Sequence, residues 1–271
     1  MSHDSLLIFA AILYIVSASL LYRSIGKRST SLQQASFGFA LAGVAVHGYA
    51  QYTHWFAGAV PDVSVAPLLS LCALVIILLL LTSTLTEKRL FTAGLVALPL
   101  AAMVLALELV IPHQPFTLDK MSTGIAVHLV SSVLAFGLLS IAGLYAFFVF
   151  IIDYFLRRHH LNPVVRTLPP LEVLEHLLFQ LITAGFLMLT ISLGSGIIFI
   201  NDIFAQHLVH KTVLSVLTWL VFGVLLFGRW RYGWRGSLAV RMTLAGVVLL
   251  ILSYFGTKLV LEVILGRSWQ S

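Results

Sequence analysis

Eight runs of about twenty predominantly apolar residues restrict the possible folds of this chain more than any other feature of its sequence. A helix of about twenty apolar residues crosses the roughly 30 Å hydrocarbon core of a bilayer. The runs are continuous, unlike the alternating ten-residue segments of membrane β-barrels. They lie near residues 5–22, 35–57, 65–85, 91–110, 124–152, 173–200, 210–227 and 240–262. We therefore predict an all-α polytopic membrane protein, a bundle of eight transmembrane helices.

The composition and the short connections support this prediction. The chain is 60% hydrophobic and only 10% charged, with a mean hydropathy of +1.04. Soluble globular domains carry about 25% charged residues, so they are excluded as a class. No connection between two runs is long enough to fold on its own. We predict that residues 1–271 form a single transmembrane domain.

Lys and Arg residues are unequally shared between alternate loops. Loops that carry an excess of these residues face the cytoplasm. Twelve of the 16 basic residues fall on one side: Arg23, Lys27, Arg28, Lys88, Arg89, Arg157, Arg158, Arg166, Arg229, Arg231, Arg235 and Arg241. This asymmetry predicts that the N-terminus and the C-terminus both lie on the outer side of the membrane. It also explains the net charge of +6 without a nucleic acid, because basic loops contact the anionic headgroups of the lipid bilayer.

The second apolar run contains the stretch VAVHGYAQYTHWF at residues 44–56, which is unusually polar for a membrane span. His47, Gln51 and His54 recur at i, i+4 and i+7, so one face of a helix carries all three. His128 enters the fifth run about one turn below the predicted outer surface. An ionisable residue in a membrane span is a functional hypothesis by default. The alternative is structural, because a neutral imidazole inside a membrane also needs a donor and an acceptor from neighbouring helices.

The sequence gives weaker indications of function for the other polar residues. His210 lies in the outer loop before the seventh run, and Cys72 is expected to be a buried packing residue. Glu108 lies near the outer end of its run, and the acidic residues form no path for protons across the membrane. The remaining histidines that we expect to be solvated are His3, His113, His159 and His160.

Imidazoles on two helices, with glycines and aromatic rings nearby, suit haem, whose iron takes one or two axial histidines. Gly43 and Gly48 would allow a second helix or a flat ligand to approach. A zinc or iron site usually needs three or four ligands with a carboxylate or thiolate, and we find no such cluster in the sequence. We predict that haem b binds non-covalently, with His128 and His47 on the iron. The further cofactor-binding candidates are His54, as the alternative second ligand, and His210.

The second half of the chain contains a series of motifs that points to a known family. The series is VHLVSSVLAFGLLSIAGLYAF (127–147), LPPLEVLEHLLFQLITAGFLMLTISLGSG (168–196), HKTVLSVLTWLVFGVLLFGRWRYGWRGSLAV (210–240) and YFGTKLVLEVIL (254–265). It resembles the cytochrome c assembly family of CcsA-like and HemX-like membrane proteins, and most closely the YpjD-like branch. The resembling region covers about residues 65–266. The resemblance implies a multi-pass protein of the bacterial inner membrane.

Departures from the family pattern limit the activity that the resemblance implies. The haem lyases of the family have a tryptophan-rich segment, WGxxWxWD, where this chain reads NDIFAQHLV (201–209), and a histidine where it has Gly228. Of the family's haem-ligand positions only that of His128 is clearly retained. The resemblance therefore implies a haem-handling or cytochrome c maturation accessory protein that is not an enzyme. The alternative is a haem-free regulatory or scaffolding subunit, like the HemX branch linked to tetrapyrrole synthesis, that stabilises a membrane or periplasmic partner protein.

Overall fold

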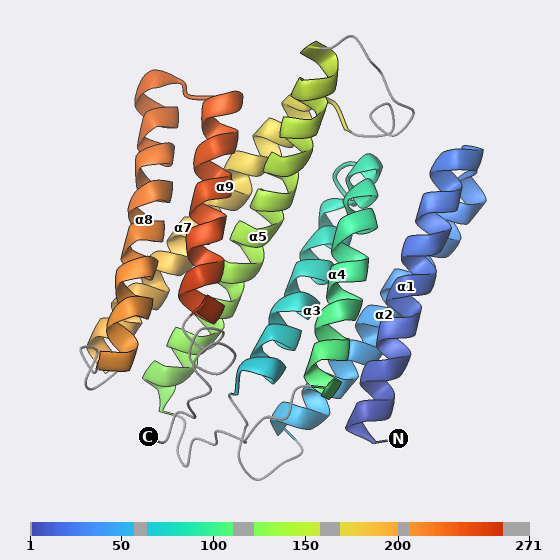
Figure 1. The fold of residues 1–271 in the computed structure, drawn as a ribbon, viewed down its shortest axis with the longest axis horizontal. Helices are drawn as coiled ribbons and strands as arrows, with labels where there is room; N and C mark the ends of the chain where they lie inside the picture. The colour runs from blue at the N-terminus through green and yellow to red at the C-terminus, as the bar shows by residue number, and fades with distance from the viewer. Residues whose placement is uncertain (1, 57–63, 111–121, 158–168, 200–205, 257–271) are drawn as a thin grey trace. The chain divides into compact units, whose positions relative to one another are not determined.

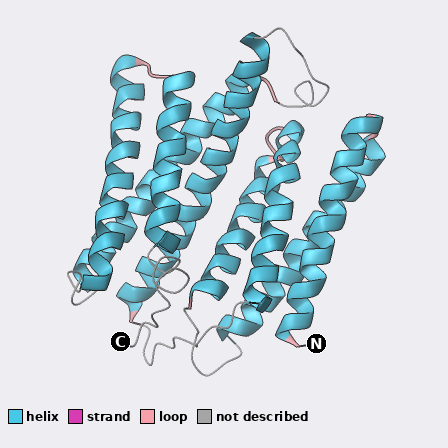
Figure 2. Cartoon of the chain, viewed as in Figure 1, coloured by secondary structure: helices cyan, strands magenta, loops and turns pink. Residues whose placement is uncertain are grey.

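The structure is a computed structural model that describes residues 2–56, 64–110, 122–157, 169–199 and 206–256. Within these ranges every regular element is a helix and no strand is present (Figure 2). The α-helices are α1 (His3–Lys27), α2 (Thr30–Phe56), α3 (Val65–Ser83), α4 (Gly94–Val110), α5 (Thr123–Arg157), α7 (Leu171–Phe199), α8 (Gln206–Tyr232) and α9 (Ser237–Ile251). A 3₁₀ segment (Lys88–Ala93) precedes α4, and a π-helical turn (Leu252–Gly256) follows α9. The predicted all-α class is confirmed.

Seven helical segments of the described chain are long and apolar enough to cross a membrane. The remaining predicted span, near residues 35–57, corresponds to α2, which has 27 residues and is therefore also long enough. It is not among the seven, because polar residues such as His47 and Gln51 lower its hydropathy. The predicted orientation, with both termini outside, stays a prediction.

The helices form two compact units, which we describe separately (Figure 1). The first consists of Met1–Met121 and Ile151–Val173, and the second of Ser122–Phe150 and Leu174–Ser271. In the first unit α1 packs against α2 and α4, and α3 packs against α4 and α2. The second unit contains most of α5 together with α7, α8 and α9. That the whole chain is a single transmembrane domain stays a prediction.

Small residues bring α1 and α2 close together in the first unit. The hydroxyl of Ser17 donates to the backbone oxygen of Ser36 at 2.8 Å, and the hydroxyl of Ser36 donates to the backbone oxygen of Ser17 at 2.7 Å. Further along the same interface, Gly43 leaves room for the ring of Tyr14, since a Cβ atom at this glycine would lie 2.7 Å from the Tyr14 Cε1 atom. This close approach is typical of packing between membrane helices. It places the phenol of Tyr14 against α2.

Glycines have the same role in the second unit. A Cβ atom at Gly185 of α7 would lie 2.7 Å from Leu139 of α5, and one at Gly246 of α9 would lie 2.7 Å from Phe222 of α8. α7 begins directly after Pro169-Pro170. Proline is common in the first helical turn, where its missing N–H would have no partner.

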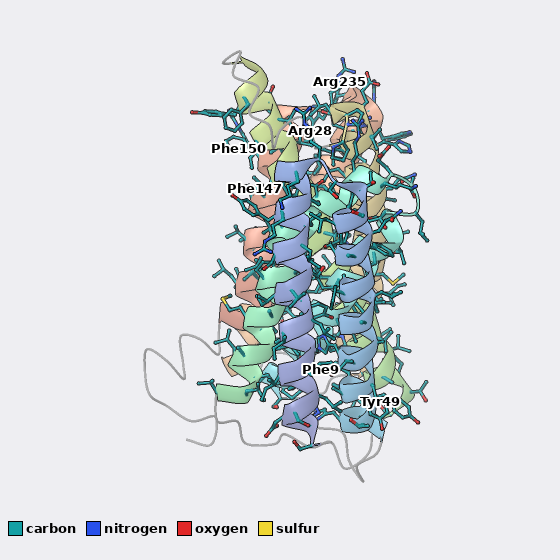
Figure 3. The ribbon with its side chains drawn as sticks, turned by 90° about the vertical axis from the view of Figure 1, so that its right-hand side faces the viewer. Phe9, Arg28, Tyr49, Phe147, Phe150 and Arg235 are labelled. Atoms are coloured by element: carbon teal, nitrogen blue, oxygen red, sulfur yellow. The ribbon has the colours of Figure 1, made fainter. Side chains whose placement is uncertain are left out.

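Large apolar side chains point away from the helices in both units (Figure 3). In the first unit, Phe9 and Tyr49 are 47% and 58% exposed. In the second unit, Phe147 and Phe150 are 41% and 52% exposed. Such outward apolar surface is expected where lipid tails, not water, surround the helices.

Candidate functional site

His47 lies at the centre of a polar network inside the first unit. Its side chain is completely buried. Its Nδ1 atom lies 3.2 Å from the hydroxyl of Tyr14 on α1, and its Nε2 atom lies 3.0 Å from the hydroxyl of Ser70 on α3. A neutral imidazole has one donor and one acceptor, so both of its nitrogens are in use. His47 therefore joins three helices through hydrogen bonds.

Gln51 extends this network by one helical turn, on the predicted shared face of α2. Its side-chain nitrogen donates to the hydroxyl of Ser70 at 2.9 Å. Its side-chain oxygen accepts from the indole nitrogen of Trp55 at 3.0 Å. Ser70 consequently bonds two side chains of α2 at once.

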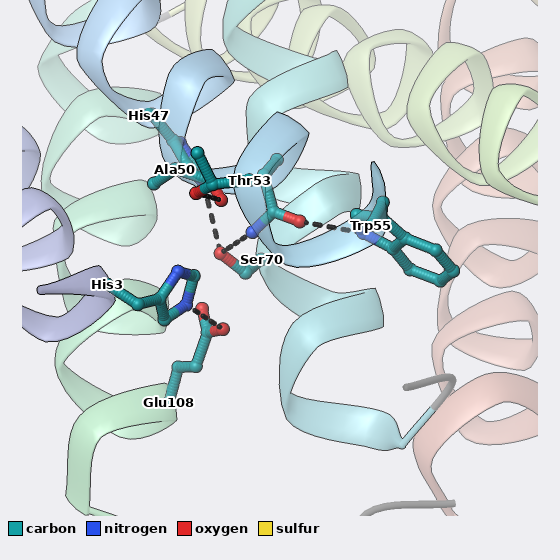
Figure 4. A network of polar contacts seen from close by, with 8 residues as sticks. His3, His47, Ala50, Thr53, Trp55, Ser70 and Glu108 are labelled. Atoms are coloured by element: carbon teal, nitrogen blue, oxygen red, sulfur yellow. Dashed lines mark hydrogen bonds and ion pairs between the residues drawn. The ribbon is translucent and has the colours of Figure 1, made fainter. Parts of the chain in front are cut away.

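His3 and Glu108 form a second polar contact, where α1 begins and α4 ends (Figure 4). The Nε2 atom of His3 lies 3.4 Å from Oε1 of Glu108, and the exposed fractions of the two side chains are 30% and 4%. The prediction that His3 is solvated is wrong. Ser2 caps α1 by accepting from the backbone N–H of Ser5 at 3.3 Å, so His3 lies in the first turn of the helix and not in a free tail.

Glu108 is a functional candidate that the sequence did not single out. The sequence did contain an indication that Glu108 needs a distant partner, because no basic residue lies within four positions of this carboxylate along its apolar helix. A partner on the same helix face is therefore impossible, and burial requires one from another helix. Sequence could indicate the need for a partner, although not that His3 supplies it.

His54 lies beside His3. The two ring centroids are 5.2 Å apart, and the ring of Trp55 lies 6.0 Å from that of His54. Three buried side-chain atoms of the described residues have no hydrogen-bond partner: His3 Nδ1, His54 Nε2 and Glu108 Oε2. All three atoms belong to the end of the first unit where α1 begins and α4 ends. We call His3, His54 and Glu108 the terminal cluster.

His128 has a different environment, in the second unit. Its Nδ1 atom lies 2.9 Å from the backbone oxygen of Ser192 on α7. A carbonyl oxygen only accepts, so Nδ1 carries the hydrogen and the neutral ring keeps a free electron pair on Nε2. Ser132 and Ser192, whose hydroxyls are 2.6 Å apart, join α5 and α7 next to this ring. His128 thus has a fixed ring and a nitrogen that can bind a metal.

Of the other histidines and the cysteine, the structure describes the side chains of His176 and Cys72. His210 belongs to the first turns of α8, where only the backbone is described. His176 is paired with Gln180 at 3.0 Å on an exposed surface of α7. Cys72 is buried and free, as predicted. His113, His159 and His160 lie outside the described residues.

The described residues fit haem at His128 better than at His47. The predicted opening at Gly43 is filled by Tyr14, whereas a Cβ atom added at Gly48 would have no other atom within 4 Å. His47 would have to give up a hydrogen bond to bind iron, and His128 would not. That these two residues bind iron stays a prediction, as do the parts of His54 and His210.

The fold and these residues define a polytopic α-helical membrane protein with histidines held inside its helical units. Comparison with known proteins gives the family. The family described as Cytochrome C assembly protein matches residues 5–265, so this chain belongs to the cytochrome c assembly family. The predicted resemblance is confirmed, and the match begins already in α1.

Two relatives show how similarity is distributed. The chain is 33% identical to the inner membrane protein YpjD of Escherichia coli (strain K12) over 201 residues, which are 73% of this chain and 75% of that protein. It is 31% identical to the cytochrome c biogenesis protein CcsA of Prochlorococcus marinus (strain MIT 9303) over 90 residues, 32% of this chain and 28% of that protein. No solved structure matches the chain.

Proposed function

We propose that this protein is a haem-handling accessory protein of cytochrome c maturation that binds haem b non-covalently and catalyses no bond chemistry. Membership of the cytochrome c assembly family supports a part in cytochrome c maturation. The similarity to an Escherichia coli inner membrane protein, together with seven apolar helices, supports a multi-pass location in the bacterial inner membrane.

The hydrogen bond between His128 and the Ser192 carbonyl carries the proposal. Histidines that bind metals commonly donate their other ring N–H to a carbonyl or carboxylate, which fixes the tautomer and makes the binding nitrogen more basic. The 2.9 Å contact provides this arrangement, with Nε2 left for iron. His128 would hold the iron of bound haem through this nitrogen.

His47 and His54, the other two histidines predicted to bind haem iron, lie in the first unit. His47 must lose its contact to Tyr14 or to Ser70 before it can bind iron, and such a hydrogen bond between membrane helices stabilises by about 0.6 kcal/mol on average. His54 has a buried Nε2 atom without a partner among the described residues, so iron binding through this atom would break no hydrogen bond. Spectra of variants at both positions separate the two candidates.

The test is an absorption spectrum of the full-length protein, purified in mild detergent from haem-replete cells, in oxidised and reduced forms. We expect a Soret band that is lost in His128→Ala. The matched control is His176→Ala, because His176 is an exposed histidine of the second unit that bonds only Gln180 in the described chain. A wild-type protein that stays colourless after addition of haemin would overturn the proposal.

A haem-free scaffold of the HemX kind is the second candidate function. The observation that favours it is the complete hydrogen bonding of His47, which suits a purely structural residue. In that case the colourless wild-type protein would co-purify with one partner protein in a fixed ratio, and His47→Ala would weaken that complex only by destabilising the first unit.

A further inference from the structure

We propose that Ser132 and Ser195 are positioning residues for His128, and that they set how strongly its ring donates electrons to the iron of bound haem. Both act through Ser192, whose backbone oxygen accepts the hydrogen bond of the ring. These roles rest on the proposed function, because they concern the same histidine. They go beyond it, since they state which hydroxyl group strengthens the iron ligand and which one weakens it.

Ser192 of α7 contacts α5 at two points. Its backbone oxygen accepts from Nδ1 of His128 at 2.9 Å, and its hydroxyl lies 2.6 Å from the hydroxyl of Ser132. His128 and Ser132 are four positions apart, so they lie on one face of α5. A single contact would leave α7 free to rotate about it. Two contacts to the same residue fix the direction of the Ser192 carbonyl group relative to the His128 ring.

Burial makes these hydrogen bonds effective. The exposed fractions of Ser132, Ser192 and Ser195 are 7%, 4% and 6%. A hydrogen bond is electrostatically stronger in such surroundings than in water, and a buried group that loses its partner is costly. Removal of one of these hydroxyl groups should therefore change the environment of the His128 ring.

Ser195 acts on the same carbonyl group in the opposite sense. Its hydroxyl donates to the backbone oxygen of Ser192 at 3.0 Å. That oxygen thus serves the Ser195 hydroxyl as well as the ring of His128. A carbonyl oxygen has two lone pairs, and it attracts each of two donors less strongly than it would attract one. We therefore expect Ser195 to weaken the hydrogen bond of the ring.

The strength of this hydrogen bond affects the iron. A histidine that donates its other ring N–H to an acceptor is a more basic metal ligand. Hydrogen bonding to an axial ligand is also one of the means by which proteins set the reduction potential of haem. A stronger donor stabilises oxidised iron more than reduced iron, so it lowers the potential. Ser132 should therefore lower the reduction potential, and Ser195 should raise it.

Redox titration of the haem-loaded protein tests these roles. The full-length protein and its variants are loaded with haemin in mild detergent, and the reduced absorption bands are followed against the applied potential. Ser132→Ala should raise the reduction potential and weaken haemin binding about tenfold, since loss of an outer-shell partner commonly costs 10–100-fold. Ser195→Ala should lower the potential and retain haemin.

Ser131→Ala is the matched control. Ser131 is the neighbour of Ser132 on α5 and is equally buried, at 5% exposed. Within the described chain its hydroxyl bonds only backbone oxygens of its own helix, those of Val127 at 2.7 Å and His128 at 3.1 Å. The control therefore loses a buried hydroxyl that contacts neither α7 nor the histidine ring. Its reduction potential should equal that of the wild type.

A double-mutant cycle assigns the effect to one hydrogen bond. Ser192→Ala keeps the backbone carbonyl that accepts from the ring and removes only the hydroxyl that faces Ser132. Ser132→Ala, Ser192→Ala and the double variant all lose the same hydrogen bond. Their reduction potentials should shift equally, whereas independent effects would add.

The outcomes separate these roles from haem binding itself. A wild-type protein that stays colourless with haemin would overturn both. A coloured wild type with equal potentials in Ser132→Ala, Ser195→Ala and Ser131→Ala would preserve haem binding and refute the positioning roles. Shifts of the same sign in Ser132→Ala and Ser195→Ala would also refute them, because general loosening of the second unit would explain such shifts.

Folding is monitored in the same samples by size-exclusion chromatography. An unchanged profile shows that a variant is folded. If Ser132→Ala is not folded, Ser195→Ala provides the decisive measurement, because the hydrogen bond that it loses lies within α7. A potential for Ser195→Ala that equals or exceeds that of the wild type would then refute the proposal.

Discussion

Removal of one hydroxyl group, in Ser70→Ala, should destabilise the first unit measurably. The Ser70 hydroxyl bonds the His47 ring at 3.0 Å and the Gln51 side-chain nitrogen at 2.9 Å, and all three residues are buried. Whichever tautomer His47 adopts, the variant leaves one nitrogen of its ring and one N–H of Gln51 without this partner.

The magnitude follows from these two lost bonds. Hydrogen bonds between membrane helices contribute on average about 0.6 kcal/mol and at most about 1.7 kcal/mol in measured cases. Two bonds that share one atom should therefore contribute about 1–3 kcal/mol to the free energy of unfolding. The three residues all belong to the first unit, so this value includes no change in the second unit.

The assay is reversible unfolding of the purified protein in mixed micelles, driven by increasing amounts of a denaturing detergent. Ser19→Ala is the matched control, because the hydroxyl of Ser19 is exposed and bonds only a carbonyl of its own helix, that of Ile15 at 2.8 Å. We expect the control to stay within about 0.5 kcal/mol of the wild type. Equal stabilities for Ser70→Ala and Ser19→Ala would refute the role of Ser70 in tying α2 to α3.

Two further predictions concern packing and orientation. Gly43→Leu should destabilise the first unit by about 1–3 kcal/mol in the same assay, because the added atoms overlap Tyr14. Gly48→Ala places its methyl group in open space and should be close to neutral. Equal losses of stability for both variants would contradict the packing described. In intact cells, Ser2→Cys should react with a membrane-impermeant maleimide if the N-terminus lies outside, while the buried Cys72 stays unlabelled as the internal control; labelling that needs cell lysis would reverse the predicted orientation.

The sequence determined the helices and the residues that share a helix face. A run of about twenty apolar residues must become a helix inside a bilayer, because only internal hydrogen bonds satisfy its backbone there. The start of α7 and the common face of His47 and Gln51 also follow from local rules, namely proline at a helix start and 3.6 residues per turn. The family followed from motifs that are contiguous in the chain.

Only the tertiary structure decided which helices are neighbours. His3 and Glu108 are 105 positions apart, and Tyr14 and His47 are 33 positions apart, so no local rule relates them. Their contacts depend on how closely α1 approaches α2 and α4, and small residues such as Gly43 set that approach by removing side-chain volume. Helical periodicity fixes positions within a helix, whereas the partner of a buried polar group is set by packing between helices. For that reason the polar faces could be found in the sequence, while the terminal cluster and the partners of His47 came from the fold.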